Sequence, residues 1–241
     1  MREPVQQLSD LPFFAGFAGN ALAGLEALAR WRGYRPGDII LEAGDASSDV
    51  YLVKDGVLRV YVRSLGGHEL ILNEIGAGAL FGEIAALDGG PRSAGIMALT
   101  RAQICALPAQ AFVDFVTQTP GASAFLLKRL AAQLRDKDQR LFELSVLPVR
   151  ARLIGLLLRL ARPRQNGGLI ISPKRHHQEL GARIGSRREV VSRNMSALQQ
   201  EGLVQVTRGG LVLADPETLR RELDEAWRRS GSASNLPMTA P

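Results

Sequence analysis

Short runs of alternating and β-branched apolar residues, separated by glycine-rich turns, fill the chain between Gly33 and Gly95. Twelve of the 25 glycines lie there, and the runs between them include DIILEAG, DVYLVKDGVLRVYV, ELILNEIG and SAGIMAL. The dipeptides Asp55-Gly56 and Gly66-Gly67 are typical of hairpin turns. This pattern predicts an antiparallel β-roll or barrel of roughly eight short strands.

Helical periodicity flanks this region. NALAGLEALARW, residues 20–31, repeats leucine at helical spacing, and helical patterns return after about residue 108. Between residues 120 and 147, five leucines follow alternating steps of three and four, with one step doubled: Leu127, Leu130, Leu134, Leu141 and Leu144. This leucine seam is typical of a coiled coil, and Pro148 predicts the end of its helix. The seam therefore predicts a homodimer with this helix at its axis.

The C-terminal part reads as two helical segments joined at Gly185, followed by a hairpin at Gly209-Gly210. This order is the winged helix-turn-helix. Asp215-Pro216 opens a further helix with Leu219 and Leu223 on one face, and the last eleven residues predict a disordered tail.

The predicted fold class is thus α+β: an N-terminal antiparallel β-roll, a long central helix and a C-terminal winged helix-turn-helix. The predicted boundaries are 1–117 for the roll with its flanking helices, 118–147 for the dimerisation helix, 148–214 for the DNA-binding domain and 215–241 for the extra helix and tail.

Charge divides the chain in two. Residues 148–241 carry 16 Lys/Arg against 8 Asp/Glu, a net charge of +8, whereas residues 1–147 carry 14 against 16. Such a basic half favours contact with a polyanion, although ordinary solvated charge gives the same composition. The chain has no apolar run of the ~18 residues needed to span a membrane and no signal-peptide pattern, so we expect a cytoplasmic protein with no membrane partner. The single Cys105 lies in the apolar run AQICAL and is interpreted as a core residue.

Residues 81–94, FGEIAALDGGPRSA, place a lone carboxylate and a lone guanidinium among small and apolar residues. Gly82 lets a backbone approach a ligand closely. EIAALD predicts one helical turn, and the backbone N–H groups of such a turn, including those of Ile84 and Ala85, bind an anion.

The side chains of this stretch also suit a phosphate-containing ligand. Arg92 is a planar, permanent cation suited to phosphate oxygens, and Ser93 donates another hydrogen bond. Glu83 would repel a phosphate, so a sugar hydroxyl is its natural donor. The stretch therefore favours a compact phosphate with a free ribose hydroxyl nearby, while an Arg–Glu ion pair that braces a β-turn would use the same two residues.

This stretch resembles the phosphate-binding cassette of cyclic-nucleotide-binding domains, and RPGDIILEAGD with DVYLVKDGVLRVYV resembles the early strands of that domain. With the seam helix and the helix-turn-helix, residues from about 10 to 214 resemble the cyclic-AMP receptor protein (CRP/FNR) family. The resemblance implies that Gly82 and Ser93 line the cyclic phosphate, that Glu83 accepts from the ribose 2′-OH and that Arg92 neutralises the phosphate. It implies a regulator and no catalysis.

The second helix of HHQELGARIGSRREVVSRNMSALQQEGLV is expected from about residue 188 to 199, with its N-terminal end in the major groove of double-stranded DNA. The candidate DNA-binding residues on and beside its outer face are Arg187, Arg188, Glu189, Ser192 and Arg193. SRREVVSR resembles the family's recognition helix, in which the residues matching Arg188, Glu189 and Arg193 read bases, and the resemblance implies palindromic TGTGA-like sites. Ser186 and Glu189 also form the S-x-x-E pattern of a capping box.

Two charges interrupt the leucine seam. Lys137 occupies the missing seam position and Asp138 flanks it, where cyclic-AMP-binding members of the family usually offer Thr and Ser to the adenine edge. A carboxylate suits the two donors of guanine and an ammonium suits its O6. The pair therefore favours cyclic GMP slightly over cyclic AMP, and an interhelical ion pair that sets register is the alternative.

The sequence thus predicts a homodimeric DNA-binding transcription regulator controlled by a 3′,5′-cyclic purine nucleotide, with RNA polymerase as a partner if it activates. The alternatives are a nucleotide-binding module that acts through protein partners, or a family member with another effector or none. The lack of clustered cysteines argues against an iron–sulfur sensor, no metal site is expected, and adjacent His176 and His177 are interpreted as ordinary helix-face residues.

Overall fold

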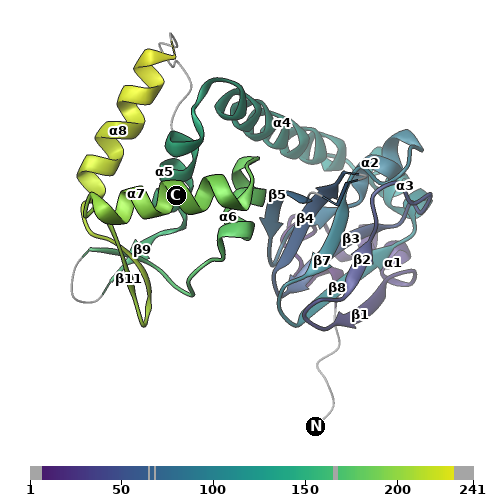
Figure 1. Ribbon diagram of the computed structural model, residues 1–241. Coiled ribbons are helices and arrows are strands. Elements are labelled where there is room, and N and C mark those ends of the chain that lie inside the picture. The colour runs from purple at the N-terminus through teal and green to yellow at the C-terminus, as the bar shows by residue number, and fades with distance from the viewer. Residues whose placement is uncertain (1–6, 65, 68, 165–167, 231–241) are drawn as a thin grey trace. The chain divides into compact units, whose positions relative to one another are not determined.

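The computed structural model describes residues 7–64, 66–67, 69–164 and 168–230. It forms two compact units, residues 1–132 and 133–241, which divide within the long helix α4 (Ala122–Val146). In Figure 1 the strands of the first unit are purple to teal, and the helices of the second unit after α4 run through green to yellow.

The first unit holds eight strands among its described residues, in two four-stranded antiparallel sheets. One sheet has the order β1-β8-β3-β6 and the other has the order β2-β7-β4-β5. The strands are β1 (Arg30–Tyr34), β2 (Ile39–Leu41), β3 (Val50–Asp55), β4 (Leu58–Arg63), β5 (Glu69–Ile75), β6 (Leu80–Phe81), β7 (Gly95–Ala98) and β8 (Ala102–Leu107). The helices beside them are the 3-10 turn Leu8–Asp10, α1 (Gly19–Glu26), α2 (Glu83–Asp88) and α3 (Ala109–Gln118). The predicted antiparallel roll is confirmed.

The turn at Asp55-Gly56 differs from its prediction. β3 pairs with β6 and β8, whereas β4 pairs with β5 and β7, so this turn passes the chain between sheets and the predicted hairpin is wrong. Gly56 has a φ of +96°, and a Cβ there would lie 2.5 Å from the backbone oxygen of Arg101, so crowding at the crossing requires glycine. The hairpin at Gly66-Gly67 is confirmed by the pairing of β4 with β5.

Two apolar clusters hold this unit together, and one of them is formed by strands of both sheets. The other packs the N-terminal segment and α3 onto the roll through aromatic edges, with Phe13 against Phe14 and Phe14 against Phe115 at ring-centroid distances of 5.0 and 5.4 Å. Cys105 is fully buried in this cluster, which confirms its interpretation as a core residue. Burial raises the pKa of its thiol to about 12. The predicted helix over residues 20–31 ends earlier, at Glu26, because Arg30 and Trp31 pair with β8.

Helix α4 confirms the predicted long helix, and Pro148 caps the next helix, α5 (Val149–Leu160). The N-terminal turns of α4 pack within the first unit through Leu126, which is 3% exposed. The seam leucines Leu127, Leu134 and Leu141 remain 64%, 59% and 64% exposed in the single chain. Three large apolar side chains at a spacing of seven residues therefore form one open stripe.

The second unit is a winged helix-turn-helix. Its sheet has the order β11-β12-β10-β9, and its helices enclose one apolar cluster. Beyond α5 the elements are β9 (Arg162–Pro163), β10 (Leu169–Ile171), α6 (His177–Ile184), α7 (Arg188–Gln200), β11 (Val204–Thr207), β12 (Gly210–Leu213) and α8 (Pro216–Arg229). Gly185 turns α6 into α7 with a φ of +62°, as the sequence predicts. A Cβ at Gly181 would lie 2.6 Å from the backbone oxygen of Ser186, so the turn also depends on this second glycine.

The C-terminal helix α8 packs back onto the same unit. The Asp215 carboxylate accepts from the backbone N–H of Thr218 at 3.0 Å and caps the helix, and Leu219 and Leu223 are buried. Trp227 stacks on Phe142 of α4 with ring centroids 5.7 Å apart. These contacts confirm the predicted helix, while the expected disordered tail at residues 231–241 lies outside the described residues.

Arg150 of α5 joins α8 to the end of α7. It donates to Glu222 and to Glu201, each at 3.0 Å, and both contacts raise the pKa of its guanidinium. One forked cation thus links three elements of the unit.

We expect Leu219→Ala to destabilise the second unit by about 2–5 kcal/mol, because it leaves a cavity where a fully buried side chain packed. Unfolding in urea, followed by Trp227 fluorescence in a Trp31→Phe background, measures this change. Asp224→Ala, at an exposed position of the same helix, is the control and should stay within about 0.5 kcal/mol of the parent. Equal stabilities for the two variants would show that α8 is not part of the unit's core.

Candidate functional site

The first candidate site begins where β6 ends. Gly82, with a φ of +81°, is the N-cap of α2, and Gly89, with a φ of +70°, is its C-cap. A Cβ on Gly82 would lie 2.7 Å from Nη1 of Arg92 and 2.9 Å from the backbone oxygen of Asp49. Both the backbone conformation and the crowding therefore require glycine. The predicted single turn of helix is confirmed.

Arg92 lies 4% exposed beneath this turn. Its guanidinium donates to three uncharged acceptors: Nη1 to the backbone oxygen of Gly82 at 2.9 Å, Nη2 to that of Asp49 at 2.7 Å, and Nε to Oγ of Ser47 at 2.9 Å. It also lies over the Tyr51 ring, 5.6 Å from the centroid. These contacts hold the cation in one position without supplying a countercharge.

The backbone around Arg92 is fixed as well. Its N–H donates to the oxygen of Asp45 at 2.9 Å, and its oxygen accepts from Gly44 at 2.8 Å. The segment is therefore tied to the loop between β2 and β3. Ser47 lies 45 residues from Arg92, so no local pattern marks it as a partner, and the sequence analysis missed it.

The other residues of the stretch surround this cation. Glu83 is the first residue of α2 and is 5% exposed, Ala85 is buried, and Ile84 is partly buried. Ser93 is exposed next to the buried Arg92. A fixed cation, a nearly buried carboxylate and an accessible hydroxyl thus lie in one short stretch, an arrangement suited to a small anion that also carries a hydroxyl.

The second candidate site is the outer face of α7. Val191, Met195 and Leu198 face the core, while Val190 is only partly buried. Arg187, Arg188, Glu189 and Arg193 are exposed, and Ser192 is partly buried. The candidate DNA-binding residues therefore share the solvent side of the first turns of this helix.

The capping box predicted at Ser186 does not form. Arg187 is the N-cap of α7, and no side chain caps the helix there. The turn places the helix start one residue later than S-x-x-E requires, because the N–H of Ser186 instead donates to the backbone oxygen of Gly181 at 2.9 Å. Glu189 therefore does not serve the capping role that competed with base reading.

Lys137 and Asp138 are both exposed on α4 in the single chain. They belong to the second unit, whereas the Arg92 stretch belongs to the first. Arg183, the remaining arginine of the turn region, directs its guanidinium to Glu179 at 3.0 Å and is nearly buried.

Two kinds of feature are absent from the described residues. No helix there is long and apolar enough to cross a membrane. No group of three or more His, Cys, Asp or Glu in that part of the chain is placed to hold a metal ion.

Comparison with known proteins matches both sites. The cyclic nucleotide-binding domain family matches residues 31–119, and the Crp-like helix-turn-helix domain family matches residues 151–222. The first match contains Gly82 and Arg92, and the second contains all of α6 and α7.

Relatives cover most of the chain. The cyclic AMP receptor protein of Thermus thermophilus is 36% identical over 208 residues, which are 86% of this chain and 94% of that protein. The cAMP-activated global transcriptional regulator CRP of Haemophilus influenzae is 29% identical over 68% of this chain and 75% of its own. A solved CRP/FNR family transcriptional regulator from Thermus thermophilus, 25% identical, superposes with a TM-score of 0.66 over 81% of this chain and 98% of its own. The chain belongs to the CRP/FNR family of transcription regulators, which bind DNA and are not enzymes.

Proposed function

We propose that this protein is a homodimeric transcription regulator whose binding to palindromic, TGTGA-like DNA sites is controlled by a 3′,5′-cyclic purine nucleotide. The observation that carries the proposal is the buried guanidinium of Arg92, held by three uncharged acceptors under Gly82. Within this proposal residues 1–117 bind the nucleotide, 118–147 dimerise, 148–214 bind DNA and 215–241 are an added segment. RNA polymerase is a further partner if the protein activates transcription.

The nucleotide assignment follows from charge and hydrogen bonding. A buried cation is costly without a countercharge, and a cyclic phosphate supplies one. Ser93 and the backbone N–H groups of Ile84 and Ala85 then donate to the phosphate, and Glu83 accepts from the ribose 2′-OH. One relative is named a cyclic AMP receptor protein and another a cAMP-activated regulator, and both names support a cyclic nucleotide as the ligand.

The dimer assignment rests on the open stripe of α4. Leu127, Leu134 and Leu141 recur every seven residues and are more than half exposed. A second copy of the helix would cover them by knobs-into-holes packing. This pairing also brings Lys137 and Asp138 of the two copies to the dimer axis.

Nucleotide control requires a ligand with different affinities for two arrangements of the dimer. We infer that the nucleotide favours the arrangement in which the two α7 helices lie about one DNA turn apart. In that arrangement Arg188 and Arg193 reach guanines and Glu189 reaches a cytosine in each half-site.

For the base we favour cyclic GMP slightly over cyclic AMP. An Asp138 carboxylate accepts from both N1 and N2 of guanine, and an ammonium at Lys137 donates to O6. Adenine instead turns its N1 lone pair toward the carboxylate, which leaves an acceptor facing an acceptor.

Arg92→Gln should weaken cyclic-nucleotide binding by about 2–4 kcal/mol, because the phosphate loses its countercharge. Titration calorimetry measures the affinity, and circular dichroism verifies the fold, since Arg92 also bonds to the backbone. Exposed Arg101→Ala is the matched control and should bind as the parent does. Glu83→Ala should cost less, and little of that cost should persist with a 2′-deoxy nucleotide. Unchanged affinity in a folded Arg92→Gln variant would refute the nucleotide site.

Arg188→Ala and Arg193→Ala should each cost about 1–3 kcal/mol of DNA affinity and relax specificity at one guanine. Selection of binding sites from random DNA, followed by gel shifts on the enriched sequence, tests both effects. Arg228→Ala, an exposed arginine of α8, should leave the selected sequence unchanged. Enrichment of a motif unrelated to TGTGA, or of none, would contradict the assigned base contacts.

Lys137→Thr combined with Asp138→Ser should abolish the preference for cyclic GMP and raise the affinity for cyclic AMP, because the pair then offers hydroxyls to adenine. Calorimetry with both nucleotides, on the parent and on the double variant, gives the two preferences. If the parent prefers cyclic AMP, or if the exchange changes nothing, the two residues serve only as an ion pair of the seam.

A further inference from the structure

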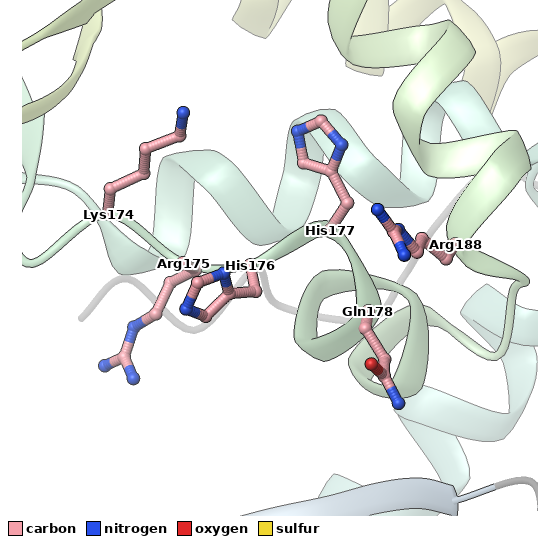
Figure 2. A pocket seen from close by; sticks show the side chains of 6 residues that line it. All are labelled: Lys174, Arg175, His176, His177, Gln178 and Arg188. Carbon is pink, nitrogen blue, oxygen red and sulfur yellow. The ribbon is translucent and has the colours of Figure 1, made fainter.

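A pocket of about 360 Å³ lies in the second unit beside the start of α7. The loop before α6, the beginning of α6 and the first residue of α7 line it, with the residues Lys174, Arg175, His176, His177, Gln178 and Arg188. Figure 2 shows the His177 ring between the Lys174 and Arg188 side chains. The pocket therefore shares Arg188 with the face of α7 proposed to read bases.

The lining is cationic. None of its six residues is acidic, and two of its permanent cations, Lys174 and Arg188, have no acidic partner within 4.0 Å among the described residues. The third, Arg175, donates to Glu179 at 3.1 Å, and Glu179 also accepts from Arg183 at 3.0 Å. The carboxylate that Arg175 contacts is thus shared by two arginines, and the six lining residues together carry a net positive charge.

We propose that DNA binding takes up a proton at His177, because this pocket receives one phosphate group of the DNA backbone next to the bases that α7 reads. The proposal rests on the DNA-binding function proposed above. Every lining side chain can donate a hydrogen bond, and phosphate oxygens are acceptors. In a helix-turn-helix the first helix crosses the DNA backbone while the second lies in the groove, which places a pocket at the start of both helices beside a phosphate.

His177 gives this pocket a proton linkage. Burial, and then the charges of Lys174, Arg188 and His176, lower its pKa, so in the free protein the imidazole is neutral near pH 7 and donates one N–H. A phosphate offsets those charges and accepts from the imidazolium, so it raises the pKa of His177. DNA binding therefore takes up a proton at this side chain.

The other neighbours of His177 do not oppose this shift. His177 also lines a second, smaller pocket, in which the other residues besides Lys174 and Arg175 are uncharged: Leu157, Ile171, Leu180, Met195, Gln199 and Leu211. The charged or titratable groups near it are therefore the lining cations, His176, and Glu179 held by Arg175.

Because the pKa of His177 is lower in the free protein than in the complex, DNA affinity should rise as the pH falls through the range between the two values. The rise is at most about tenfold per pH unit and protomer, and it levels off below the free-protein value.

The test is fluorescence anisotropy of the full chain on a selected DNA site from pH 5.5 to 8, with His177→Gln compared with the parent. The parent should bind more tightly as the pH falls, and His177→Gln should lose most of that slope while still selecting the same sequence. His68→Gln, at the third histidine of the sequence, is the control and should keep the parental slope. A His177→Gln variant that keeps the parental slope would overturn the proposal while leaving the DNA-binding function intact.

Two further arms separate the sources of the phosphate. Lys174→Gln should weaken binding to all sequences alike and lower the salt dependence by about one counterion per half-site, unlike Arg188→Ala. An NMR titration of the His177 ring should show its pKa rising with the DNA duplex and not with millimolar inorganic phosphate. A rise with inorganic phosphate alone would instead identify a site for a small free anion. A parent that binds no DNA at any pH would refute the proposed function itself, and the DNA-phosphate assignment with it.

Discussion

The buried guanidinium of Arg92 organises the part of the roll that carries the proposed nucleotide site. Its three donors bind the Gly82 oxygen before α2, the Asp49 oxygen before β3 and the Ser47 hydroxyl, so one side chain joins segments more than forty residues apart. Gly82 must then be glycine, because a Cβ would overlap the guanidinium it supports. Since each of these acceptors is uncharged, the guanidinium is held in one position and its charge stays available for the proposed anion.

In the second unit, an arginine with acidic partners joins separate helices. Here Arg150 is paired with two carboxylates, and its fork links α5, α7 and α8, while Trp227 stacks on Phe142 of α4. Glu143 of α4 also accepts from Arg159 of α5 at 3.3 Å. The C-terminal half of α4 is thereby fastened to the helices that carry the DNA-binding face. A change in the packing of two α4 helices in a dimer would move that face directly, which gives the proposed nucleotide control a physical route.

Both proposed ligands present phosphate, but the two sites meet it differently. Arg92 is nearly buried and fixed, which suits a small ligand that must be enclosed. The pocket at Lys174 and His177 is open and lined by several cations, which suits one phosphate of a long polyanion. The first arrangement favours a defined ligand, and the second contributes affinity that is independent of sequence and sensitive to salt and pH.

The sequence by itself determined the order of elements, the cassette and the exposed face of α7, because hydrophobic period, glycine and charge at fixed spacing are local signals. It could not show that Asp55-Gly56 crosses between sheets, since hairpin chemistry and a sheet crossing use the same turn residues and only strand pairing separates them. It also suggested a capping box at Ser186, which does not form because the turn packs closely on Gly181 and α7 starts one residue later. Ser47 and Asp49 as partners of Arg92, and the gathering of Lys174, His177 and Arg188 in one pocket, were decided only by the tertiary structure, because these contacts join residues that are distant in the chain or lie on different elements.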